Sequence, residues 1–169
     1  MYHKEKFIVV EGPIGVGKTT LATKLSKTFN CKSMLENFSE NPFLSQFYQN
    51  REQYAFSTQL YFLLKRSQQY IDYKLSEDSK AGIISDYFLG KDELFAEVTL
   101  NKQELELYRT VYNMLKLKLP KPDLIIYLQA PVEKLIDRIK SRAIDYEQGI
   151  SRDYLNSIID AYTNYFHTY

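Results

Sequence analysis

The sequence predicts an α/β fold in three layers, in which helices flank a central parallel sheet. Short apolar runs recur along the chain and alternate with longer helical stretches, a pattern typical of strand–helix–strand units. The first apolar run ends in a glycine-rich turn, and the third ends in a carboxylate, Asp86. Sheets of this kind bind ligands where the carboxyl ends of their strands meet. We therefore expect the glycine-rich turn and Asp86 to lie at one site.

The elements of the first half follow from the spacing of its apolar residues. A strand is expected at 7–10, which is a β-branched run before the glycine-rich turn. A helix is expected at 18–29, because Leu21, Leu25 and Phe29 are spaced four apart and share a face. After these we expect a strand at 33–35, a short helix that holds Phe43 to Tyr48, and a long helix from about 53 to 75.

The second half continues the alternation, with strands expected at 82–86 and 124–128. Between them a helix is expected at 91–119, where Pro120-Lys121-Pro122 stops it. Two helices follow the last strand, one with an apolar face of Val132, Leu135, Ile136 and Ile139, and one from about 151 to 166. Because no linker or repeat interrupts this order, 1–169 is interpreted as a single domain.

Composition excludes several classes of function. The net charge is +1, from 22 basic and 21 acidic residues, and no basic stripe suits a nucleic acid or an anionic membrane. No apolar run approaches the roughly 18 residues of a membrane-spanning helix. A single cysteine, Cys31, fits a reducing compartment, and the short segment before the first strand leaves no room for a signal peptide. These features predict a cytoplasmic protein that binds neither nucleic acid nor membrane.

The glycine-rich turn matches the phosphate-binding pattern G-x-x-x-x-G-K-[ST] from Gly12 to Thr19. Its glycines let successive backbone N–H groups turn towards an anion, and the helix that begins there adds its positive dipole end. Lys18 is placed to reach the outer phosphates of a nucleoside triphosphate, and Thr19 to bind Mg²⁺. The residues expected to contact the phosphates are Gly12, Gly15, Val16, Gly17, Lys18, Thr19 and Thr20.

The loop alone does not separate kinases from GTPases or ATPase motors, which share it. A GTPase would need an Asn-Lys-x-Asp segment after a later strand, and the chain has Gln129-Ala130-Pro131 at that point. A kinase that acts on a hydroxyl gains from a carboxylate that accepts the proton. Glu36 and Asp86 each follow a predicted strand and are candidates for this work, although spacing alone also fits a solvated loop residue or a helix cap.

Two further pairs share helical faces. Gln59 and Arg66 are seven residues apart on the long helix, where they either face the edge of a base or form an exposed polar flank. Arg138 and Arg142 are spaced four apart, where they either clamp a transferring phosphoryl group or form a plain basic surface. The spacing leaves both alternatives open.

Taken together and in order, these pieces resemble the deoxynucleoside kinase family, especially its bacterial purine-preferring branch. Beyond the phosphate loop, the resemblance depends on Glu40-Asn41-Pro42-Phe43, Phe47-Tyr48, the run from Ser57 to Phe62, Ser85-Asp86-Tyr87, Lys91-Asp92, Phe95-Ala96 and 138–142. It covers essentially the whole chain. It implies a P-loop kinase fold and the transfer of a phosphoryl group from ATP, with Mg²⁺, to the 5′-hydroxyl of deoxyguanosine or deoxyadenosine in nucleotide salvage.

The resemblance also implies roles for individual residues. Glu36 would act as the catalytic base, with Lys18, Asp86 and Arg138 assisting, and Asp86 and Thr19 would lie at Mg²⁺. The other roles are contacts with the substrate or the phosphates: Tyr48 and Glu147 with the sugar 3′-hydroxyl, Gln59 with the base edge, Arg66 and Asp92 as a pair in the base pocket, Tyr87 beside the 5′-oxygen, and Arg138 and Arg142 in a lid.

Three departures from the family pattern distinguish this chain. Asp86-Tyr87-Phe88 stands where many members have an acid followed by Arg-Ser, so Tyr87 takes the place of an arginine that contacts the 5′-oxygen. Lys91, one turn later, is a candidate substitute. Ile144 stands in the place of a third lid arginine. The sequence also ends at Tyr169, so the fifth strand and the adenine-contacting loop of relatives are expected to be missing.

Several alternatives stay open at this stage. A deoxycytidine-preferring kinase would use the same pocket residues, and a non-catalytic regulatory subunit is compatible with Tyr87 and Ile144. A nucleoside monophosphate kinase would need a basic acceptor site, for which Lys65 and Arg66 are the available cations. The resemblance favours a homodimer or a heterodimer with a related kinase subunit. The helix at 103–117 presents Leu105, Tyr108, Tyr112 and Leu115 either to such a partner or to its own sheet.

Overall fold

The computed structural model describes residues 7–75, 82–116 and 121–168, which form the parallel α/β sheet that the sequence predicts. The strands are β1 (Phe7–Glu11), β2 (Lys32–Met34), β3 (Ile83–Ser85) and β4 (Leu124–Tyr127). They lie in the order β2-β3-β1-β4, and each neighbouring pair is parallel. The carboxyl ends of the strands therefore share one edge of the sheet, where a ligand site is expected.

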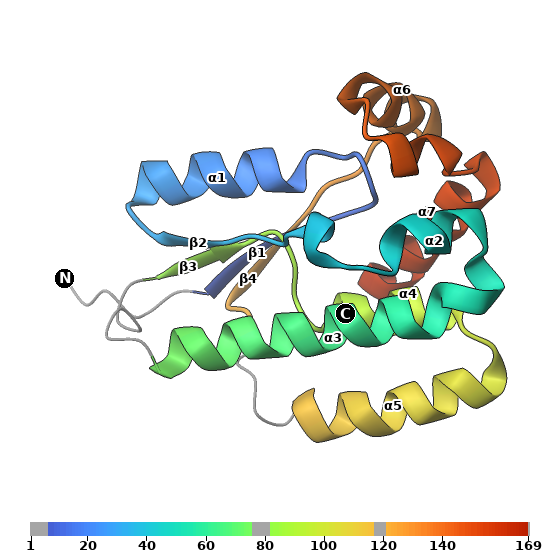
Figure 1. Ribbon diagram of the computed structural model, residues 1–169. Coiled ribbons are helices and arrows are strands. Elements are labelled where there is room, and N and C mark those ends of the chain that lie inside the picture. The colour runs from blue at the N-terminus through green and yellow to red at the C-terminus, as the bar shows by residue number, and fades with distance from the viewer. Residues whose placement is uncertain (1–6, 76–81, 117–120, 169) are drawn as a thin grey trace.

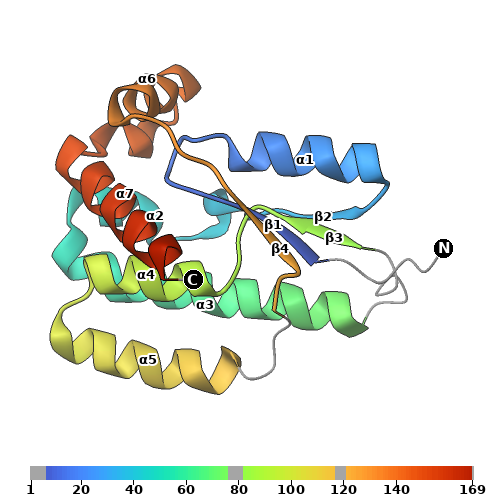
Figure 2. The ribbon, with the colours of Figure 1, turned by 180° about the vertical axis from the view of Figure 1, so that it is seen from behind.

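Helices cover both faces of the sheet and also gather beyond the carboxyl ends of its strands (Figure 1). α1 (Lys18–Phe29) lies on one face, and α3 (Arg51–Leu75) and α4 (Gly90–Thr99) lie on the other, with α5 (Lys102–Lys116) outside them (Figure 2). Beyond the strand ends lie α2 (Leu44–Gln49), α6 (Val132–Arg142) and α7 (Arg152–His167). Two short 3₁₀ turns, η1 (Phe38–Glu40) and η3 (Asp145–Gly149), complete the described elements.

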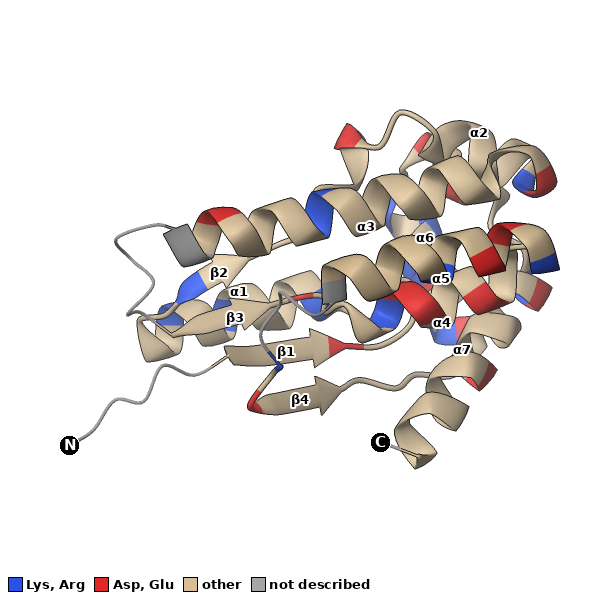
Figure 3. Ribbon diagram, turned by 90° about the horizontal axis from the view of Figure 1, so that it is seen from below, with Lys and Arg blue, Asp and Glu red and all other residues tan. Residues whose placement is uncertain are grey.

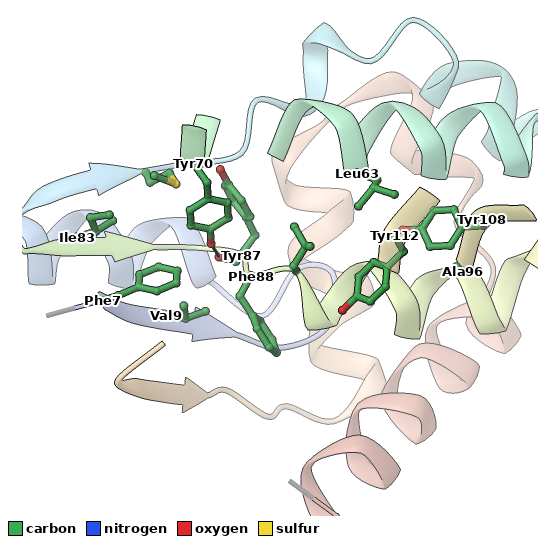
Figure 4. Packing of buried hydrophobic residues seen from close by; sticks show 12 residues of the cluster. Phe7, Val9, Leu63, Tyr70, Ile83, Tyr87, Phe88, Ala96, Tyr108 and Tyr112 are labelled. Atoms are coloured by element: carbon green, nitrogen blue, oxygen red, sulfur yellow. Dashed lines mark hydrogen bonds between the residues drawn. The ribbon is translucent and has the colours of Figure 1, made fainter. Parts of the chain in front are cut away.

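Alternation along the strands divides the core between the two faces of the sheet. Phe7 and Val9 of β1 belong to the cluster that includes Tyr70 of α3 (Figure 4). The alternate side chains of β1 point to the opposite face, where Val10 packs with Ala22 of α1. Because both faces are covered, β1, β3 and β4 are largely continuous apolar runs in the sequence rather than alternating ones.

The stretch predicted as one helix at 91–119 forms two helices, so that prediction is wrong. α4 ends at Thr99, and Leu100 is extended, with φ −94° and ψ 145°. α5 then begins with a reciprocal cap: the N–H of Glu104 donates to Asn101 Oδ1 at 3.0 Å, and the N–H of Asn101 donates to Glu104 Oε2 at 3.2 Å. An asparagine followed three residues later by a glutamate signals a helix start. Positions 117–119 lie outside the described residues.

The apolar face of α5 packs against its own chain. Tyr108 and Tyr112 are 0% and 5% exposed and belong to the same core cluster as Leu63 and Ala96 (Figure 4). The alternative in which this face is open to a partner is therefore wrong. No helix within the described ranges is long and apolar enough to span a bilayer.

Candidate active site

The loop between β1 and α1 has the backbone shape of an anion site. Gly12, Gly15 and Gly17 have φ values of 147°, 84° and 106°, which glycine adopts freely and other residues do not. A Cβ on Gly12 would lie 2.4 Å from the carbonyl oxygen of Leu128, which follows β4. α1 begins at Lys18, directly after the loop, so its free N–H groups and the positive end of its dipole face the loop.

The side chain of Lys18 folds back over this loop. Its Nζ donates to the carbonyl oxygens of Gly12 at 2.8 Å and Pro13 at 3.1 Å. Burial, followed by the positive charge of Lys91, lowers the pKa of Lys18 to about 8. Among the described residues no carboxylate forms an ion pair with this ammonium group, and the outer phosphates of a triphosphate would supply the missing anion.

Two neighbouring strands bring Asp86 and Glu36 to the loop from separate parts of the sequence. Thr19 Oγ1 donates to Asp86 Oδ2 at 2.5 Å, and Asp86 Oδ1 accepts from the backbone N–H of Glu36 at 2.8 Å. Because β2 and β3 pair in parallel, the residues that follow them lie side by side. The hydroxyl of Thr19 and the carboxylate of Asp86 are hard oxygen donors, which suit Mg²⁺ that completes its shell with water and substrate phosphates.

The carboxylate of Glu36 lies between two cations. Arg66 Nε donates to Glu36 Oε1 at 2.5 Å, and Lys91 Nζ lies 3.2 Å from Oε2. The side chain of Glu36 is 4% exposed. Burial by itself raises the pKa of Glu36, but Arg66 and then Lys91 outweigh it and hold the pKa below its ordinary value. Glu36 is therefore ionised at neutral pH and able to accept a proton.

Arg66 of α3 also forms a buried ion pair with Asp92 of α4, as the family resemblance implies. Burial raises the pKa of Asp92 to about 6, and Arg66 is the main charge that opposes this rise. Oδ2 of Asp92 has no hydrogen-bond partner among the described residues. Arg66 lines the cavity beside the loop, whereas Asp92 is fully buried. The structure therefore places Arg66 against the cavity and Asp92 behind it, as the buried partner of Arg66.

A cavity of about 660 Å³ opens beside the phosphate loop, between residues of α2, α3, α4 and α6. Its walls are largely aromatic, and aromatic faces suit a planar ligand. Gln59 lines the cavity, is 3% exposed and makes no hydrogen bond to another described residue, so its amide is available to a ligand. The aromatic residues of the walls are Phe38, Phe47, Tyr48, Phe62, Phe95 and Tyr154.

The two residues assigned to the sugar, Tyr48 and Glu147, lie on the same cavity. The ring of Tyr48 stacks on that of Tyr146, with centroids 6.2 Å apart and an interplanar angle of 7°. Glu147 Oε2 lies 2.8 Å from a guanidinium nitrogen of Arg142. Burial raises the pKa of Glu147, and Arg142 opposes the rise. The structure thus connects η3, which carries Glu147, to α6, which carries Arg142.

Both arginines of α6 line the cavity, as a clamp on phosphates requires. Arg138 donates to the carbonyl oxygen of Val16 in the phosphate loop at 2.9 Å. α6 ends at Arg142, and Ala143 has a left-handed conformation with φ 50°. Ile144 therefore lies outside the helix and does not continue the face formed by Arg138 and Arg142.

Tyr87 does not lie in the cavity, and its prediction as a substrate contact is wrong. It is 0% exposed and packs in the core cluster with Tyr70 and Phe88 (Figure 4). Its hydroxyl donates to Gln69 of α3. Asp86 and Tyr87 are consecutive residues at a strand end, so when Asp86 faces the loop, Tyr87 points to the opposite side, into the core.

Sequence reasoning missed Glu11, the last residue of β1. Its carboxylate accepts from the N–H of Gly12 at 3.1 Å, from the N–H of Phe88 at 3.2 Å and from the hydroxyl of Tyr162 at 2.7 Å. Burial raises its pKa, with Lys91 as the main opposing charge. In Figure 3 the carboxyl end of β1 is coloured as acidic. An acid at the end of an apolar strand was the available signal, and the structure shows that Glu11 joins the loop to α7.

Fold and site together define an α/β protein with an anion-binding loop, a buried and ionised acid beside it, and an aromatic cavity next to both. The family model for deoxynucleoside kinases matches residues 8–169. The chain belongs to the deoxynucleoside kinase family, which confirms the resemblance seen in the sequence.

Relatives of known activity support this assignment. Deoxyguanosine kinase of Bacillus subtilis (strain 168) is 40% identical over 163 residues, which cover 92% of this chain and 76% of the relative. The deoxyadenosine/deoxycytidine kinase of the same organism is 31% identical over 170 residues, which cover 96% and 77%. A solved structure of deoxyadenosine kinase from M. mycoides, with dCMP and dCDP bound, is 28% identical with a TM-score of 0.85, and the match covers 96% of this chain and 84% of that one.

Proposed function

We propose that this protein transfers the γ-phosphoryl group of ATP, with Mg²⁺, to the 5′-hydroxyl of deoxyguanosine or deoxyadenosine in cytoplasmic nucleotide salvage. The observation that carries the proposal is the position of Glu36. It is joined to the phosphate loop through Asp86 and Thr19, and to the cavity through Arg66 and Lys91. A triphosphate in the loop and a nucleoside in the cavity would therefore meet beside this carboxylate.

Each residue of the site has a chemical role in this reaction. Lys18 and the N–H groups of the loop would bind the outer phosphates, and Arg138 and Arg142 would cover them. Glu36 would take the 5′-hydroxyl proton as the 5′-oxygen bonds to the γ-phosphorus and the bond to the ADP oxygen breaks. Thr19 and Asp86 would hold Mg²⁺, which neutralises phosphate charge when bound.

Polar side chains of the aromatic cavity would bind the acceptor nucleoside. Tyr48 and Glu147 would hold the sugar 3′-hydroxyl, and Gln59 and Arg66 would bond the edge of the base, with Asp92 fixing Arg66. The names of the relatives favour a purine acceptor, since deoxyguanosine and deoxyadenosine recur among them. Deoxycytidine is the second candidate, because one of those relatives is a deoxyadenosine/deoxycytidine kinase.

The site argues against a monophosphate acceptor. Lys65 is exposed and pairs with Glu40 at 3.5 Å, away from the cavity. Arg66 is already neutralised by Glu36 and Asp92. No cation among the described residues near Gln59 is therefore left for an acceptor phosphate, and a monophosphate would meet the charge of Glu36.

One assay tests the proposal. Purified protein with Mg·ATP is offered a panel of deoxynucleosides and nucleoside monophosphates, and labelled products are separated. We expect phosphorylation of deoxyguanosine or deoxyadenosine in preference to deoxycytidine and thymidine. Transfer only to monophosphates would refute the proposal, and a complete lack of transfer would favour a non-catalytic regulatory subunit.

We also propose that the protein works as a homodimer or pairs with a related kinase subunit. α3 and α5 expose large apolar side chains, Leu64 at 50%, Leu107 at 55% and Met114 at 67%. Such side chains on neighbouring helices suit a protein interface. Light scattering should give twice the 20.0 kDa chain mass for a homodimer, and Leu107→Glu should shift it to the monomer. A monomeric mass at every concentration, with and without a related subunit, would reject this surface.

A further inference from the structure

Lys91 is a buried cation whose ammonium group has one hydrogen-bonding partner among the described residues. It is 3% exposed, lies in the first turn of α4 and lines the cavity. Its Nζ lies 3.2 Å from Glu36 Oε2 and within 6 Å of two aromatic ring centres, Phe95 at 5.5 Å and Phe38 at 5.9 Å. An ammonium group has three N–H donors, and within the described ranges only Glu36 accepts one of them.

The other cation on Glu36 differs from Lys91 in this respect. Arg66 contacts both Glu36 and Asp92, so it keeps a carboxylate partner whatever happens to Glu36. Lys18 is likewise engaged, with two carbonyl oxygens of the phosphate loop. Lys91 is the cation whose only hydrogen-bonding partner among the described residues is the proposed base.

Phosphoryl transfer changes the charge that Lys91 faces. When Glu36 takes the proton of the acceptor hydroxyl, its negative charge disappears and negative charge develops on the acceptor oxygen and the phosphoryl oxygens. A buried ammonium that loses its hydrogen-bonded anion is left with unsatisfied donors, which is unfavourable even though Glu11 and Asp92 still act on its charge at longer range. The new negative charge arises next to Glu36, within reach of a flexible lysine side chain. The position of Lys91 therefore suits a cation that follows the charge from the base to the transferred group.

The segment between Asp86 and α4 offers no alternative cation. Tyr87 lies in the core, and no positively charged side chain follows Asp86 before Lys91. Lys91, in the first turn of α4, is therefore the first cation after β3 and the one that this part of the chain contributes to the reaction site.

We propose that Lys91 is a catalytic residue that moves its hydrogen bond from Glu36 to the 5′-oxygen and the phosphoryl group during transfer. This inference rests on the proposed function. The 5′-hydroxyl proton goes to Glu36, the 5′-oxygen bonds to the γ-phosphorus, and the bond from that phosphorus to the β-phosphate oxygen breaks with its electron pair leaving on ADP. Lys91 contributes its charge and N–H donors and neither gains nor loses a proton.

A double-mutant cycle tests this role. Single-turnover rates are measured for the natural protein, Lys91→Met, Glu36→Gln and the double variant, with Lys65→Met as a control for loss of an exposed lysine outside the cavity. Lys91→Met should lower kcat about 10²–10³-fold, as for loss of one group that stabilises transition-state charge. In the Glu36→Gln background it should cause a further fall of at least about tenfold, because the lost contact is with the phosphoryl group. Lys91→Arg, which keeps a charge, should recover part of the rate.

The opposite result is equally clear. If Lys91 only holds Glu36 in place, its loss has no further effect once Glu36 is a glutamine, and the inference is overturned. This comparison also holds if Lys91→Met alone folds poorly, because the double variant leaves no unpaired charge from the Glu36–Lys91 pair, and melting curves check its fold. Absence of any transfer by the natural protein would instead remove the proposed function itself, so the two failures are distinguishable.

Discussion

The hydroxyl of Thr19, at the start of α1, donates a 2.5 Å hydrogen bond to the Oδ2 atom of Asp86, which follows β3. Asp86 also accepts from the N–H of Glu36, so both of its oxygens are used. It therefore couples the phosphate loop to the proposed base, and it is the carboxylate that we propose as a ligand of Mg²⁺.

Replacing Asp86 by asparagine should weaken Mg²⁺ binding sharply, because the amide has no negative charge and only one of the two acceptor oxygens. We expect a fall of about 10–100-fold in Mg²⁺ affinity or in activity. The measurement is a Mg²⁺ titration of the rate at fixed ATP. Thr19→Ser, which keeps the hydroxyl, serves as the matched control and should stay near the natural value. An unaltered titration for Asp86→Asn would exclude Asp86 from the metal site.

Glu36→Gln should slow the chemical step without preventing nucleotide binding. The amide cannot act as a base, and losses of a general base usually lower kcat by about 10²–10⁴-fold. ATP binds at the loop, so its dissociation constant should change little. Rapid-quench rates and equilibrium binding of ATP are compared, with melting curves to confirm folding. If kcat is unchanged, Glu36 is not the base.

Removing one member of the Arg66–Asp92 ion pair should lower the unfolding free energy more than removing both members. Asp92→Leu alone leaves the Arg66 guanidinium with one carboxylate fewer in a buried site, which should cost about 3–5 kcal/mol of unfolding free energy. Arg66→Leu with Asp92→Leu should restore part of that loss and turn acceptor preference towards thymidine, since the pocket becomes apolar. Urea unfolding and kcat/KM for each deoxynucleoside provide the two readouts. A double variant that keeps its purine preference would show that the pocket is assigned wrongly.

Two glycines of the phosphate loop offer a matched pair. Gly12→Ala and Gly17→Ala both force a non-glycine residue into positive φ, at 147° and 106°, which costs about 1–3 kcal/mol. Only Gly12 also has a backbone atom in the way, the Leu128 oxygen at 2.4 Å, whereas a Cβ on Gly17 has nothing within 4 Å. Gly12→Ala should therefore lower the unfolding free energy more than Gly17→Ala. Equal losses in denaturant unfolding would mean that Leu128 moves aside freely.

ATP affinity should decline in alkaline solution because of Lys18. Burial and the charge of Lys91 lower its pKa to about 8, so below that pH the side chain carries its charge and above it the charge is lost. Since bound phosphates favour the charged form, affinity should be level below about pH 8 and fall up to tenfold per unit above it. Lys91→Met removes the like charge and should move this decline to higher pH. Titrations of ATP binding from pH 6 to 10 would disprove the assignment if affinity stayed constant throughout.

Features that depend on neighbouring residues in the sequence were predicted well. The phosphate loop, β1 and α1 follow from one contiguous segment, and their bounds agree closely with the structure because each interaction lies within a few residues. The division between α4 and α5 was equally local. It was missed because the cap formed by Asn101 and Glu104 is polar and leaves the apolar periodicity on either side almost unchanged.

The sequence by itself determined the fold class, the anion loop and the set of residue types that phosphoryl transfer needs. The tertiary structure alone decided which of them meet. Glu36, Arg66, Asp86 and Lys91 come from four separate segments of the chain, and their contacts depend on the order β2-β3-β1 and on the packing of α3 against α4. It also turned Tyr87 into the core, since one residue of register along an extended chain reverses the direction of a side chain. Spacing along a chain cannot specify contacts of that kind, because they form only when distant segments pack.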